Sequence, residues 1–174
     1  THSAQPLSAA VALEVLRLYE ECGVMANGQR VARAFGQGLD DLLAHPLVGD
    51  SRHRGLLGAL ELVSSKTTKT GFDAALDLPT RMVATAYRNG IVFRAFGDNI
   101  LGFAPALTFT ESDFGLMFER LKKTLDDVLA ALAARAANTS STMLVDAVMV
   151  CVGNVTATES IPPASTFSPR NESC

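Results

Sequence analysis

The sequence predicts an α+β fold in which a small antiparallel sheet is packed with helices. Four segments carry apolar residues at the three- and four-residue steps of an amphipathic helix: 7–22, 25–44, 78–89 and 110–132. Short apolar runs bounded by turn residues lie between them, at 54–63, 91–93 and 100–103. The turn chemistry of Gly97-Asp98-Asn99 makes the last two runs an antiparallel hairpin.

The composition argues against nucleic-acid and membrane partners. The 174-residue chain has a formal net charge of −3 and no basic stripe. No apolar run approaches the roughly 20 residues that cross a bilayer, and the first residues lack the pattern of a secretory signal. Cysteine occurs at Cys22, Cys151 and Cys174, an odd number without metal-ligand spacing. We therefore expect a cytoplasmic protein whose thiols stay reduced.

Two helices are expected in the first quarter of the chain. The first ends at Gly23, has Ser3 as a candidate N-cap, and shares one apolar face among Leu7, Val11, Val15 and Leu18. The second ends at His45-Pro46 and buries Val31, Phe35, Leu39 and Leu42. Its glycines, Gly28, Gly36 and Gly38, either weaken the helix or let another element approach closely.

A largely buried strand is expected over Arg54–Val63, with Gly55 and Gly58 at bends. A loop follows to Asp77. The third helix, Leu78–Asn89, is expected to direct Met82, Val83 and Ala86 inward.

The hairpin that follows places Arg94 at its mouth, on a strand otherwise built of apolar residues. A guanidinium there can donate two parallel hydrogen bonds to a carboxylate, so Arg94 is a candidate anion-binding residue. The alternative is an arginine that extends from a sheet edge and pairs with a surface acid.

The last helix begins at an N-cap, Thr110, followed by early acidic residues. Its apolar stripe is typical of a core-facing helix and comprises Phe114, Met117, Phe118, Leu121, Leu125, Val128, Leu129 and Leu132. The opposite face, which includes Arg120, Asp126 and Asp127, is expected to be solvated. After Ala137 the sequence loses both charge and period, so residues 137–174 are expected to be a disordered tail.

No catalytic residue and no metal ligand can be assigned from the sequence. The three histidines, His2, His45 and His53, are isolated from any patterned nucleophile, and no phosphate-binding glycine motif occurs. A Schiff-base lysine needs a buried position beside a strand end. None of the lysines fits, because Lys66 and Lys69 lie in a polar loop and Lys122 and Lys123 lie on a solvated helix face.

The order of several short segments resembles the C-terminal part of class III pyridoxal-phosphate-dependent aminotransferases, of the omega-amino acid or amine:pyruvate type. The resemblance covers Thr1 to about Leu132. The segments that carry it are Thr1–Pro6 with Ala9–Leu13, His45–Gly49, Arg54–Leu62, Gly90–Arg94, Asp98–Ile100, Phe103–Leu107 and Thr110-Glu111.

The resemblance implies a fold-type-I homodimer that uses pyridoxal 5'-phosphate and acts on an amino donor and a keto acid. Residues 1–24 would end the large cofactor-binding domain, and residues 25–136 would form the small C-terminal domain. Thr1 would contact the cofactor phosphate of the neighbouring subunit, and Arg94 would pair with a substrate carboxylate. The Schiff-base lysine of such enzymes precedes the position of Thr1.

The sequence therefore leaves two functions open. The first is the C-terminal part of an aminotransferase that moves an amino group between an amine or omega-amino acid and a keto acid such as pyruvate. The alternative is a non-catalytic carboxylate-binding or interaction module derived from the small domain. On either interpretation, the chain alone is expected not to transaminate.

Overall fold

The computed structural model describes residues 5–138 and divides the chain into two compact units. Among the described residues, 5–23 belong to the first unit and 24–138 to the second. The first unit contains helix α1 (Pro6–Glu21). The second contains, in chain order, α2 (Val24–Asp41), η1 (Leu42–Ala44), β1 (Val48–Arg54), β2 (Leu57–Leu62), η2 (Ala74–Leu76), α3 (Leu78–Arg88), β3 (Arg94–Phe96), β4 (Ile100–Phe103) and α4 (Glu111–Asn138).

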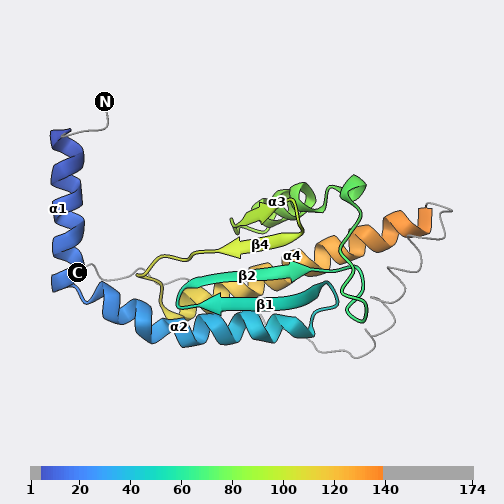
Figure 1. Ribbon diagram of the computed structural model, residues 1–174, viewed down its shortest axis with the longest axis horizontal. Helices are drawn as coiled ribbons and strands as arrows, with labels where there is room; N and C mark the ends of the chain where they lie inside the picture. Colours follow the sequence, from blue (N-terminus) through green and yellow to red (C-terminus); the bar gives the residue numbers. More distant parts are fainter. Residues whose placement is uncertain (1–4, 139–174) are drawn as a thin grey trace. The chain divides into compact units, whose positions relative to one another are not determined.

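The second unit is built on a four-stranded antiparallel sheet with the order β1-β2-β4-β3 (Figure 1). The α+β class predicted from the sequence is therefore confirmed. Strand β1 was not anticipated: the predicted strand over 54–63 is only the second half of a hairpin that turns at Gly55, where φ is +59°. Because β1 is an edge strand with three exposed residues at its end, its sequence is polar and lacks the apolar run that predicts a strand.

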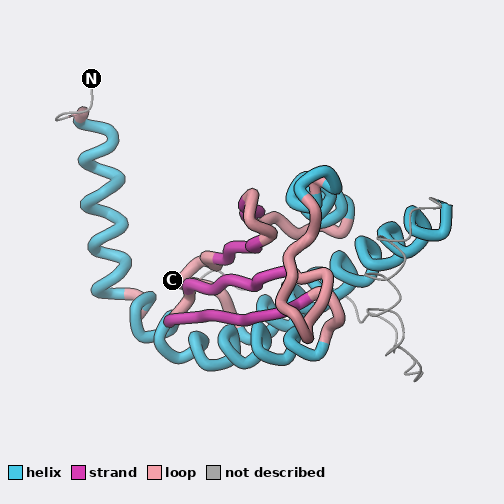
Figure 2. Tube along the Cα trace, turned by 45° about the vertical axis from the view of Figure 1, so that its right-hand side comes forward, coloured by secondary structure: helices cyan, strands magenta, loops and turns pink. Residues whose placement is uncertain are grey.

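Helices α2 and α4 lie along one face of the sheet (Figure 2), and apolar residues of that face and of α2, α3 and α4 form the hydrophobic core. Alternate strand residues point toward the helices, as expected for period-two side chains. Leu60 and Leu101 lie directly opposite each other on that inner face and are buried. Phe35 of α2 and Phe114 of α4 meet with ring centroids 5.5 Å apart. The apolar stripes predicted for these two helices are thus core-facing.

The glycines of α2 allow close approach of other elements. A Cβ at Gly36 would lie 2.5 Å from the ring of His53, and one at Gly38 would lie 2.1 Å from the ring of Phe118. The sequence left open whether these glycines weaken the helix or let another element approach. At Gly36 and Gly38 another element approaches closely. The absence of a side chain brings α2 near β1 on one side and near α4 on the other.

Helix α1 matches the predicted first helix, but its N-cap is Gln5. The Gln5 side chain accepts a hydrogen bond from the Ser8 N–H at 2.6 Å; Ser3 lies outside the described residues. Gly23, with φ at +61°, ends the helix as expected. None of the residues of α1 is buried. Cys22 is the C-cap residue of α1, and its N–H donates to the Leu18 carbonyl at 3.0 Å.

Two local predictions differ from the structure. Strand β3 begins at Arg94, so Ile91–Phe93 is a connecting segment and not part of the strand. In α3, Met82 and Ala86 are buried, whereas Val83 is 44% exposed and does not face the core. The predicted tail lies almost entirely outside the described residues. Within residues 5–138, no helix has the length and apolar content of a membrane span.

Candidate functional site

Arg94 is the first residue of β3 and lies opposite Gly102 of β4. The two strands are joined by the turn at 97–99, so Arg94 stands at the open end of the hairpin, as the sequence predicted. The adjacent residue pair, Ala95 and Leu101, belongs to the inner face of the sheet. Since side chains alternate along a strand, Arg94 lies on the outer face, away from the core helices.

Among the described residues, the Arg94 guanidinium contacts an aromatic ring and no carboxylate. Its Cζ lies 5.3 Å from the centroid of the Phe96 ring. Within the described part of the chain, Arg94 makes no ion pair. The alternative interpretation, an arginine paired with a surface acid, therefore does not apply to this part. Over residues 5–138, the Phe96 ring face stabilises this cation, and the guanidinium N–H groups have no carboxylate acceptor.

A pocket of about 850 Å³ adjoins Arg94. Most of its lining is apolar, and four phenylalanines contribute to it: Phe93, Phe96, Phe103 and Phe109. Three charged residues complete the lining, namely Arg94, Asp113 and Arg120. An apolar cavity with a few polar groups is the usual form of a small-molecule site.

The other two charged groups of the pocket are engaged within the fold. Arg120 donates from Nη1 to the Gly90 carbonyl at 2.6 Å and is half-buried, which corrects the expectation that this side chain is merely solvated. The Asp113 carboxylate accepts from the Thr110 N–H at 2.8 Å and from its hydroxyl at 2.7 Å. The Asp113 N–H in turn donates to Thr110 Oγ1 at 3.3 Å, so Thr110 is the N-cap that the sequence predicted for α4.

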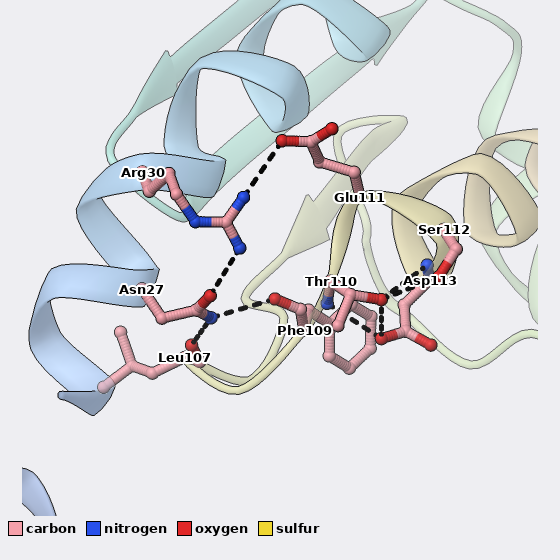
Figure 3. A network of polar contacts seen from close by, with 8 residues as sticks. All are labelled: Asn27, Arg30, Leu107, Phe109, Thr110, Glu111, Ser112 and Asp113. Carbon is pink, nitrogen blue, oxygen red and sulfur yellow. Dashed lines mark hydrogen bonds and ion pairs between the residues drawn. The ribbon is translucent and has the colours of Figure 1, made fainter. Parts of the chain in front are cut away.

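One wall of the pocket is tied to α2 by Asn27 (Figure 3). Its Nδ2 donates to the carbonyl of Leu107 at 2.7 Å and to that of Phe109 at 3.0 Å. Arg30 donates to Asn27 Oδ1 at 2.8 Å and pairs with Glu111 at 3.0 Å. This network fixes the segment between β4 and α4, which carries Phe109 into the pocket. Sequence analysis missed it because the contacts between α2 and residues 107–111 join residues 80 or more positions apart.

The structure offers no internal lysine for covalent chemistry. All four lysines of the chain are exposed: Lys66, Lys69, Lys122 and Lys123. Lys66 donates to the Leu43 carbonyl at 2.5 Å, and Lys123 pairs with Asp127 at 2.7 Å. Thr1 lies outside the described residues. Over residues 5–138, no group of three His, Cys, Asp or Glu side chains is placed to hold a metal ion.

A buried histidine lies apart from the pocket, between α2 and α4. His45 Nδ1 accepts the Leu47 N–H at 3.2 Å, which leaves Nε2 to carry the ring proton and contact Asp126 Oδ1 at 3.2 Å. Burial lowers the pKa of His45, and the attraction of the Asp126 carboxylate only partly offsets that effect. We interpret His45 as a neutral structural group. Asp126 therefore makes a tertiary contact, although the sequence predicts that its face of α4 is solvated.

Comparison with known proteins places these features in a family. A family model described as "Aminotransferase class-III" matches residues 1–125. The putrescine–pyruvate aminotransferase of Pseudomonas aeruginosa is 34% identical over 136 residues, which are 77% of this chain and 29% of that protein. A probable mitochondrial gamma-aminobutyrate transaminase 3 of Oryza sativa subsp. indica is 31% identical over 79% of this chain and 26% of its own length.

Solved structures agree with the sequence comparison. The omega-transferase from Vibrio fluvialis superposes with a TM-score of 0.71 at 33% identity, over 77% of this chain and 32% of that one. An omega-aminotransferase from Paracoccus denitrificans gives a TM-score of 0.68 at 34% identity, over 72% and 28% of the two chains. The chain therefore spans less than a third of the length of these relatives.

Proposed function

The chain belongs to the class III aminotransferases, and on that premise we propose that it is the C-terminal part of an enzyme acting between an amine or omega-amino acid and a keto acid such as pyruvate. One relative is named for putrescine and pyruvate, and two solved neighbours are named as omega-type enzymes. In the proposal, residues 1–24 end the large domain and 25–136 form the small domain of a homodimer.

Enzymes of this family use pyridoxal 5'-phosphate, but the residues of this chain do not by themselves fit that cofactor. A lysine that bonds to its aldehyde must be desolvated to be uncharged at neutral pH, and all four lysines here are exposed. The lysine is therefore proposed to come from a part of the enzyme outside this chain. Thr1 is proposed to contact the cofactor phosphate of the neighbouring subunit.

The observation that carries the proposal is the Arg94 guanidinium, which borders an apolar pocket and has no carboxylate partner in the described chain. A substrate carboxylate entering the pocket would accept two parallel hydrogen bonds from its fork. The apolar walls would contact the rest of the molecule. Arg94 is thus proposed to select substrates and acceptors that carry a carboxylate, such as pyruvate.

The test compares two half-reactions in the aminotransferase that carries this chain. Losing a charge-assisted pair of hydrogen bonds costs roughly 1.5–3 kcal/mol, so Arg94→Ala is expected to lower the specificity constant for pyruvate by about one to two orders of magnitude. The half-reaction with a plain aryl-alkyl amine is expected to change far less. Single-turnover measurements separate the two.

Two further variants sharpen this test. Arg94→Lys is expected to restore only part of the pyruvate reaction, since a point charge cannot reproduce the planar fork. Arg33→Ala removes the same charge from an exposed position on α2 and is expected to leave both half-reactions unchanged. An equal loss in both half-reactions for Arg94→Ala would show that Arg94 supports the fold and does not bind carboxylates.

The four exposed lysines also favour a second candidate for the chain on its own, a non-catalytic carboxylate-binding module. Both candidates use Arg94 to bind a carboxylate. They differ in whether the protein also has an enzyme part that supplies the lysine. Sequencing the coding DNA upstream of Thr1 separates them. An open frame that encodes a lysine between a strand and a loop supports the enzyme, whereas a start codon directly before Thr1 supports the module.

A further inference from the structure

Phe96 and Gly102 form a contact surface beneath the Arg94 side chain. Arg94 and Phe96 are two residues apart on β3, so both side chains lie on the outer face of the sheet. Gly102 is the partner of Arg94 on β4. The guanidinium carbon of Arg94 lies 5.3 Å from the centroid of the Phe96 ring, within the range of a cation–π interaction.

The lack of a side chain at Gly102 makes room for the ring. A Cβ built on Gly102 would lie 2.9 Å from Phe96 Cε2, closer than side-chain carbons approach. The ring therefore leans diagonally across the strand pair and covers the glycine, an arrangement that stabilises sheets at glycine positions. Phe96 stays 44% exposed, and the Arg94 guanidinium lies over its ring.

We propose that this Phe96–Gly102 platform holds the Arg94 guanidinium while no carboxylate is bound, which makes Phe96 a specificity-determining residue of the pocket. The inference rests on the proposed role of Arg94 in carboxylate binding. In the proposal, the guanidinium leaves the ring when it turns its fork toward a carboxylate in the pocket. The ring and the carboxylate therefore compete for the same cation.

The platform weakens carboxylate binding by the free energy of the contact between the Arg94 guanidinium and the Phe96 ring, because this contact is lost. A cation–π interaction at an exposed site corresponds to about a two- to fivefold change in an equilibrium constant. Ligands without a carboxylate leave Arg94 on the ring and do not meet this competition. Phe96 thus sets how readily the pocket takes carboxylates relative to uncharged molecules.

The contact itself can be measured on the full 174-residue chain by NMR of arginine side chains. The Arg94 δ-methylene and Nε–H signals, identified by their loss in Arg94→Gln, are expected upfield because the guanidinium that they adjoin lies over the Phe96 ring. Phe96→Leu and Gly102→Ala are each expected to abolish the upfield shift, and Phe96→Tyr is expected to keep it. Tyr87→Leu removes another exposed aromatic side chain and serves as the matched control. An unchanged shift in both Phe96→Leu and Gly102→Ala would overturn the platform.

The competition is measured by titrating the same proteins with sodium 4-phenylbutyrate, with the neutral 4-phenylbutyramide as control. Phe96→Leu is expected to bind the carboxylate about two- to fivefold more tightly than wild type and the amide equally. Equal carboxylate affinity in wild type and Phe96→Leu would overturn the specificity role. If Arg94→Gln bound the carboxylate as tightly as wild type, the proposed role of Arg94 and the competition would both be wrong. The NMR shift tests the contact between Arg94 and Phe96 independently of that result.

Discussion

At the scale of single residues, His45 couples protonation to the stability of the fold. Its ring is buried between α2 and α4, and burial holds its pKa below the ordinary value of about 6.5. As the pH falls below about 6.5, the unfolded chain binds a proton at this position before the folded chain does. The stabilisation present above that pH is therefore lost as the pH decreases.

This gives a prediction for His45→Gln, which keeps hydrogen-bonding groups but cannot titrate. Wild type is expected to lose more unfolding free energy than the variant between pH 7.5 and pH 5.5. Urea unfolding at the two pH values measures both differences. A decline of the same size in the two proteins would show that His45 makes no contribution to the pH dependence.

At the scale of elements, the packing of α2 against α4 depends on a glycine. A Cβ at Gly38 would meet three atoms of the Phe118 ring, the nearest at 2.1 Å, and that ring also contacts Phe35 with centroids 6.3 Å apart. Overpacking costs about 1–3 kcal/mol, whereas alanine gains about 1 kcal/mol over glycine inside a helix. The close approach of the two helices therefore outweighs helix propensity at this position.

The prediction compares the same substitution in two helices. Gly38→Ala is expected to lower the unfolding free energy. Gly115→Ala on α4 is expected to raise it by up to about 1 kcal/mol, because no other side chain of residues 5–138 lies within 4 Å of the new Cβ. Thermal or urea unfolding gives both values. Stabilisation by both substitutions would mean that the helices can move apart without loss.

The same scale explains which elements the sequence could predict. The helices were predicted because each has an apolar stripe wide enough to show its period. Strand β1 was missed because its only buried residue is Val48, so no alternation is visible in the sequence. Strand β3 was placed too early because Ile91–Phe93 has the composition of a strand, but its chain pairs with β4 only from Arg94 onward.

At the scale of the whole molecule, the position of the lysines sets what the chain can do alone. All four are exposed, whereas a lysine that bonds covalently to a carbonyl group needs a buried position. We expect the isolated chain, incubated with pyridoxal phosphate, to show no transaminase turnover and no site-specific lysine adduct after borohydride reduction. Mass spectrometry of the digested chain makes the measurement, and one stoichiometric adduct at a single lysine would contradict it.

The candidate site was only partly predictable because most of its contacts join residues that are distant in the sequence. Arg94 could be singled out locally, because one charge interrupts an apolar strand. Its neighbours could not, since the placement of Gly102 opposite Arg94 depends on strand register, and the contact of Arg120 with Gly90 joins residues 30 positions apart. Thr1, inferred from the family resemblance, stays a prediction.

The order of the strands has a consequence for how copies of this chain can associate. Strands β1 and β3 are the two edges of the sheet, and an unpaired edge is a template onto which another chain can add a strand. Here β1 carries Asp50, Arg52 and Arg54, and β3 is only three residues long. Charges and shortness both oppose strand addition, so neither edge favours a continuous intermolecular sheet. A homodimer of the proposed enzyme would accordingly join through surfaces other than these strand edges.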